Sequence, residues 1–255
     1  MALYAALAFW LYVIIFLAWG VYAVWCRLLK PRVVNAILLP GTLVAQLGHV
    51  VGLLVTGNAV TNLRLMGDNK TGAPEADTPK EPAGVPILSP ALVGLLPLVF
   101  CAACLHVAAQ QWGGVILAEL AGMPQTLVAQ SLPASRAEFW DLLRNAVTQM
   151  EQMVGAIVRS DLPNWPTALF LYLAICLTVR MAPFPGNRRG ALVAVLVASA
   201  VVAVLASVVP AVRTFIEDRS WPALSVAVAT LLCLMLASLV VAGAVGLAKV
   251  LVRGG

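Results

Sequence analysis

The stretch that decides the fold of this chain reads LPGTLVAQLGHVVGLLVTG and covers residues 39–57. It is apolar and long enough for a membrane helix, with Gln46 and His49 in its middle. Polar side chains at bilayer depth are costly and by default indicate a function. Positions 45 and 49 lie one helical turn apart and share a face, with position 46 beside them. The stretch is therefore both a predicted membrane helix and the first candidate site.

The composition of the whole chain predicts an integral membrane protein. Of its 255 residues, 62% are hydrophobic and 11% are charged, whereas soluble domains have about 25% charged residues. The net charge of +5 comes from 16 basic residues that stand singly or in twos and threes. Because they form no basic stripe, we expect no nucleic-acid partner. The expected partners are the lipid bilayer and other membrane proteins.

The hydropathy pattern predicts an all-α fold with one polytopic membrane domain over residues 1–255. We expect about six transmembrane helices, at residues 3–27, 34–56, 88–119, 163–181, 190–211 and 221–248. Pro40 and Gly41 are expected to kink or open the second of them. Residues 57–86 indicate an extramembrane loop, and the alternation over 59–66 predicts a short β-strand or hairpin after the second helix.

Residues 136–159 predict a different element, an amphipathic surface helix. Ser135 and Glu138 form a capping box at its start. Its apolar face is predicted to carry Phe139, Leu143, Ala146, Val147, Met150, Val154 and Ile157. Such a helix lies on the membrane surface or packs against another extramembrane element. A connector is the simplest interpretation of it.

These features predict a multi-pass protein, and we expect it in a bacterial inner (cytoplasmic) membrane. With six crossings, the basic residues divide eight and eight between the two sides, so the positive-inside rule gives no orientation. That division places Arg180 on one side and Arg27, Lys30 and Arg32 on the other.

The second segment resembles the zinc helix of the site-two-protease family of intramembrane metallopeptidases, in its small multi-pass branch. The matching pieces are Pro40-Gly41-Thr42, then Ala45-Gln46-Leu47-Gly48-His49 in place of His-Glu-x-x-His, then Thr56-Gly57-Asn58. In that family a short membrane-associated strand follows the zinc helix, and residues 60–66 lie in that position. A later helix begins with an Asp that supplies the third zinc ligand, and Asn187 stands in the corresponding place.

The departures from the family motif remove the groups that the family uses to bind zinc and to cleave peptides. Ala45 replaces a ligating His, Gln46 cannot take a proton from a zinc-bound water, and Asn187 offers only a neutral amide oxygen. Only His49 remains of three ligands and a base. The resemblance therefore implies a catalytically inactive pseudoprotease with no zinc or other cofactor. We expect a binding or scaffold subunit for other membrane proteins, with Ala45, Gln46, His49 and Asn187 as the remnant of the site.

Two alternatives from other classes remain open. Cys101, Cys104 and His106 miss the covalent haem signature by one residue. His49 and His106 are the only two histidines and can ligate haem or copper between helices, as in a redox subunit. A small transporter is the further alternative. Proline-interrupted helices fit it, but intramembrane carboxylates for ion coupling are absent, since Glu119 lies only at the end of a predicted span.

Overall fold

A computed structural model describes residues 2–58, 63–64, 75–76, 88–114, 116, 132–133, 135–160, 164–182, 188–215 and 221–253. Within these residues the chain is helical apart from two strands of two residues each. The helices are α1 Ala2–Leu28, α2 Pro31–Ile37, α3 Leu39–Val55, α4 Leu88–Trp112, α6 Arg136–Arg159, α7 Trp165–Val179, α8 Arg188–Val208, α9 Pro210–Phe215 and α10 Trp221–Arg253.

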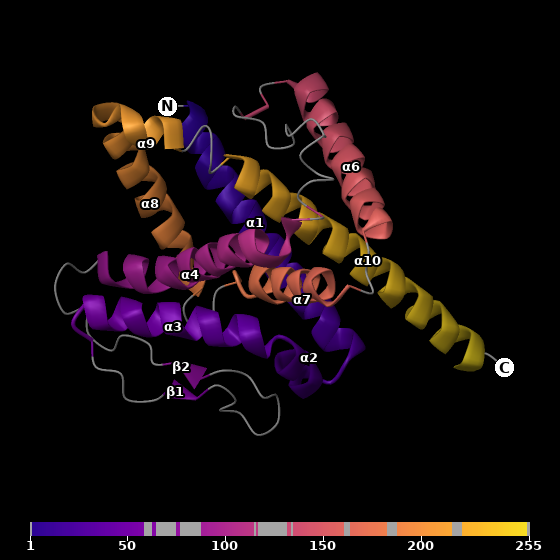
Figure 1. The fold of residues 1–255 in the computed structure, drawn as a ribbon. Coiled ribbons are helices and arrows are strands. Elements are labelled where there is room, and N and C mark those ends of the chain that lie inside the picture. The colour runs from indigo at the N-terminus through magenta and orange to yellow at the C-terminus, as the bar shows by residue number, and fades with distance from the viewer. Residues whose placement is uncertain are drawn as a thin grey trace.

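Helices α3, α4 and α7 pack side by side, and the long helices α1 and α10 pack along each other across them (Figure 1). Helix α8 packs against α4 and α1, and α6 contacts α10. The main buried cluster joins α1, α3, α4, α6, α7, α8 and α10 and includes Trp10, Ile14, Ala45, Leu177 and Leu231. The all-α membrane architecture predicted from the hydropathy is therefore present in the described part of the chain.

The described residues contain three or four candidate membrane spans, fewer than the six predicted for the whole chain. Three described helices are long and apolar enough to cross a bilayer, within α1, α4 and α10, and a fourth is obtained if α2 and α3 count as one bent span. The predicted span at 190–211 corresponds to α8, Arg188–Val208, which has 21 residues. The predicted span at 163–181 contains the shorter apolar helix α7, Trp165–Val179. Fifteen residues of helix extend about 22 Å, less than the hydrocarbon thickness of about 30 Å. For the segment at 163–181, hydropathy identified the apolar residues but not the length of the helix that they form.

The kink expected at Pro40 and Gly41 is present as a break between two helices. Helices α2 and α3 meet at an angle of 77°, with Leu38 between them and Pro40 in the first turn of α3. The break is compensated by α7, because the Tyr172 hydroxyl donates a hydrogen bond to the Ile37 carbonyl at 2.7 Å. A broken helix is tolerated at membrane depth where neighbouring groups bond its freed carbonyls in this way.

Two other predicted elements have counterparts after the second segment and before α7. Strand β1 (Leu63–Arg64) pairs antiparallel with β2 (Glu75–Ala76), and the rest of the predicted 59–66 strand lies outside the described residues. The helix predicted over 136–159 is present as α6, and the Ser135 side chain accepts a hydrogen bond from the Glu138 amide at 3.2 Å.

The apolar face predicted for α6 divides in the structure. Ala146, Met153 and Ala156 are buried where α6 packs on α10. Phe139, Leu143, Val147 and Val154, four of the residues predicted for that face, are exposed. The side of α6 that packs on α10 is therefore rotated away from the centre of the predicted apolar face.

Candidate functional site

The three remnant-site residues of the second segment lie buried on α3. Ala45 is fully buried, and the side chains of Gln46 and His49 are each only 2% exposed. Thr42, Gln46 and His49 follow one another at helical spacing and form a polar stripe on one face of the helix, and Thr42 is buried too. The Thr42 hydroxyl donates to the Leu38 carbonyl at 2.9 Å, at the break before α3. A polar face of α3 is therefore enclosed by protein.

The residues on this face do not fit a zinc ion. One imidazole is available, that of His49, and position 45 supplies no ligand atom, whereas catalytic zinc needs three protein ligands. Among the described residues there is no group of three His, Cys, Asp or Glu side chains that could hold a metal. Asn187, the predicted fourth member of the remnant site, lies outside the described residues.

The alternative metal or haem site is not assembled in the described part of the chain. Gly48 packs against Leu96 and Pro97 of α4, and His106 lies nine residues beyond Pro97, about 14 Å further along the helix axis. His106 is exposed and its Nε2 lies 3.0 Å from the Gln110 side-chain nitrogen on the same helix. Cys101 is buried, whereas Cys104 is half-buried. His49 and His106 are therefore too far apart to bind the same metal ion or haem.

Small residues bring α3 unusually close to its neighbours. A Cβ atom added to Gly48 would lie 2.7 Å from the Leu96 carbonyl oxygen, and one added to Gly52 would lie 2.9 Å from the Val93 Cα. Gly41 lies against the Cys176 carbonyl of α7. Glycine at this spacing allows membrane helices to pack backbone to backbone. Glycines therefore allow the helix that carries the remnant site to pack closely on α4 and α7. One of them, Gly48, lies within the Ala45–His49 motif itself.

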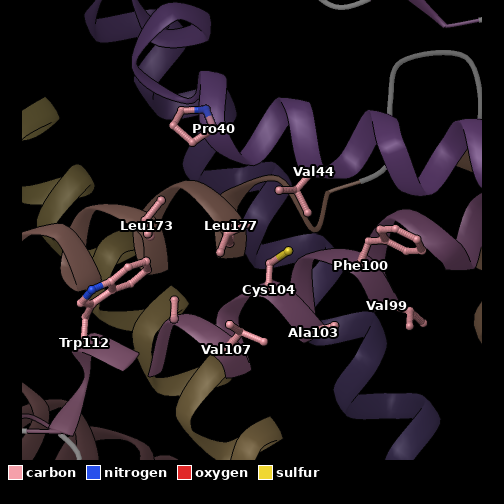
Figure 2. Close-up of a pocket in the computed structure, with 11 residues that line it drawn as sticks. Pro40, Val44, Val99, Phe100, Ala103, Cys104, Val107, Trp112, Leu173 and Leu177 are labelled. Atoms are coloured by element: carbon pink, nitrogen blue, oxygen red, sulfur yellow. The ribbon is translucent and has the colours of Figure 1, made fainter. Parts of the chain in front are cut away.

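An apolar pocket opens beside this close packing, between α3, α4 and α7 (Figure 2). Its volume is about 550 Å³, within the range of ligand-sized pockets. The Cys104 thiol points toward the space between Val44 and Leu177 (Figure 2). The pocket is lined by Pro40, Val44, Val99, Phe100, Ala103, Cys104, Val107, Ala108, Trp112, Leu173 and Leu177. All these side chains are apolar or thiol, so the pocket suits a hydrocarbon or a side chain of a membrane helix.

A second buried polar cluster surrounds Arg180, which ends α7 and is 7% exposed. Its Nη2 donates a hydrogen bond to the Asn35 Oδ1 of α2 at 2.6 Å, and its Cζ lies 5.2 Å from the centre of the Tyr22 ring. The Tyr22 hydroxyl donates to the same Asn35 oxygen at 3.1 Å. This cluster joins α1, α2 and α7 at the broken helix.

The Arg180 cluster corrects the division of basic residues made from the sequence. Because Arg180 bonds Asn35, it lies at the same end of the molecule as the α1–α2 turn with Arg27, Lys30 and Arg32. The sequence argument placed it opposite them, since it assumed that every apolar segment crosses the membrane. Sequence reasoning also missed Arg180 as a buried group, because its only local signal is one cation at the end of an apolar run.

Comparison of the chain with protein-family models, with curated proteins and with solved structures gave no match. The likeness to the site-two-protease family accordingly rests on sequence features alone, those of the second segment, of residues 60–66 and of Asn187.

Proposed function

We propose that this chain is a non-catalytic membrane protein that binds a transmembrane segment of another membrane protein between α3, α4 and α7. The observation that carries the proposal is the apolar pocket of about 550 Å³ between these helices. The family resemblance supports the non-catalytic part, because the frame of the zinc helix is kept and its ligands are lost. Binding, and not peptide cleavage, is the activity that such a frame retains.

The side chains of the pocket favour a helix as the occupant. Ala103, Cys104 and Ala108 are small and lie on one helix, α4, and small side chains let two membrane helices approach closely. Val44 and Leu177 stand on the flanking helices and provide larger apolar surfaces for van der Waals contact. A partner helix that inserts a bulky side chain here would fill the pocket.

Photo-crosslinking in intact membranes tests this proposal. A photoreactive phenylalanine analogue placed at Val107, a pocket residue that is 54% exposed, is expected to give one discrete protein adduct. Mass spectrometry should map the attached peptide to a transmembrane segment of the partner. Filling the pocket with the change Ala103→Leu should reduce the adduct several-fold, because the partner side chain then meets an occupied space.

Leu236 on α10 is the matched control, since it is 47% exposed and lies outside the pocket. The analogue at Leu236 should give no such adduct. Equal adducts at both positions, or adducts with lipid alone, would contradict the proposed binding site. Stoichiometric zinc in the purified protein that disappears in His49→Ala would contradict the non-catalytic assignment.

A further inference from the structure

The turn that joins α1 to α2 carries three exposed cations, Arg27, Lys30 and Arg32. In the part of the chain that the structure describes, none of the three makes an ion pair or a side-chain hydrogen bond. Every Asp and Glu whose side chain is described lies on α6. The turn is therefore a cationic surface with no compensating acid among the described side chains.

The turn lies at the end of the candidate membrane span of α1. The candidate span within α1 covers Leu3–Leu28 and ends where the turn begins. The Trp25 indole nitrogen donates a hydrogen bond to the Ser238 hydroxyl at 2.7 Å, which fixes this end of α1 on α10.

Apolar side chains alternate with the cations. Leu29 is 50% exposed and Val33 is 46% exposed, so large hydrophobic groups stand in the open next to the charges. A surface that presents cations and exposed aliphatic side chains together fits the boundary between lipid headgroups and acyl chains. It fits an aqueous anion poorly, because the aliphatic groups would remain in water.

The buried Arg180 adds a fourth positive charge behind the turn. It bonds Asn35, three residues beyond Arg32 on the same short helix α2. Its polar neighbours among the described residues are Asn35, Tyr22 and the thiols of Cys26 and Cys176, and no carboxylate is among them. A buried charge is screened less than an exposed one, so Arg180 raises the positive potential at this surface.

We propose that the α1–α2 turn is a binding site for the headgroups of anionic phospholipids, contacted by Arg27, Lys30 and Arg32 while Leu29 and Val33 enter the acyl region. The phosphate groups carry the negative charge that complements these cations, and charge-assisted hydrogen bonds to Arg and Lys hold them. The site is independent of the α3–α4–α7 pocket and of the function proposed for it.

The test uses the full chain in nanodiscs that contain equal amounts of phosphatidylglycerol and phosphatidylcholine. After mild delipidation, native mass spectrometry counts the lipids that stay bound. The unmodified chain is expected to retain the anionic lipid preferentially. The combined change Arg27→Gln, Lys30→Gln and Arg32→Gln should lower that preference about tenfold or more. Because these side chains are exposed and make no ion pair with described residues, the variant should still fold.

The matched control changes the three arginines of α6, Arg136, Arg144 and Arg159, to Gln. It removes the same charge from a helix that also carries three acids, Glu138, Asp141 and Glu151, and it should leave the lipid preference unchanged. An equal loss in both variants would show a net-charge effect and overturn the proposed site. Displacement of the lipid by millimolar inorganic phosphate would also overturn it, since that result identifies a site for soluble anions.

Discussion

At the residue scale, Gly48 fixes how closely α3 approaches α4. Its added Cβ would meet backbone atoms of Leu96 and Pro97 at 2.7 Å, and backbone cannot rotate away as a flexible side chain does. We therefore expect Gly48→Ala to destabilise the protein by about 1–3 kcal/mol through overpacking. The measurement is thermal unfolding of the purified protein in detergent.

Gly243 of α10 provides the control for that substitution. It is also helical, but nothing lies within 4 Å of a Cβ added there. Gly243→Ala should be neutral or stabilise the helix by up to about 1 kcal/mol, the propensity gain of alanine over glycine. If both changes lowered the melting temperature equally, close packing of α3 on α4 would not be the reason for Gly48.

At the element scale, the break between α2 and α3 depends on α7. The Tyr172 hydroxyl and the Cys176 thiol both donate to the Ile37 carbonyl, at 2.7 Å and 3.4 Å. Arg180 then holds α2 through Asn35 at 2.6 Å. One helix thus bonds both a backbone carbonyl and a side chain of the broken segment, so the bend is a consequence of tertiary contacts as well as of Pro40.

A double-mutant cycle tests the bond between α2 and α7. Asn35→Ala alone is expected to cost about 1.5–3 kcal/mol of unfolding free energy, because it leaves a buried cation without that charge-assisted hydrogen bond. In an Arg180→Met background the same change should cost clearly less, since no charge remains to be compensated. Equal costs in the two backgrounds would mean that the contact contributes nothing to holding α2 against α7.

Local signals explain which of these elements the sequence could predict. The capping box at Ser135 and Glu138 lies within four residues and located the start of α6 at Arg136. Pro40 likewise predicted the break before α3. The Arg180–Asn35 bond joins residues 145 positions apart, and no periodicity reports such a pair. The buried stripe of Gln46 and His49 was visible as a candidate site, whereas the pocket beside it requires three helices to be placed in space.

At the scale of the whole molecule, the charges now favour one orientation. Counting six straight spans separated Arg180 from the α1–α2 turn and left the two sides equal. The broken segment and the short α7 change that count, because Arg180 bonds Asn35 of α2 and joins Arg27, Lys30 and Arg32 at one end. Short loops rich in Lys and Arg stay on the cytoplasmic side. The α1–α2 turn is therefore expected in the cytoplasm, with the start of α1 on the opposite face.

Cysteine accessibility decides this orientation. Lys30 is exposed within the turn, so Lys30→Cys places a reactive thiol at the level of the headgroups and not in the acyl region. A membrane-impermeant maleimide should label this variant in inside-out vesicles and leave it unlabelled in right-side-out vesicles, with the parent chain correcting for its five native cysteines. Labelling only in right-side-out vesicles would place the cationic turn outside. Neutralising Arg27, Lys30 and Arg32 together should produce a mixed population, because the charge that retains the turn in the cytoplasm is then removed.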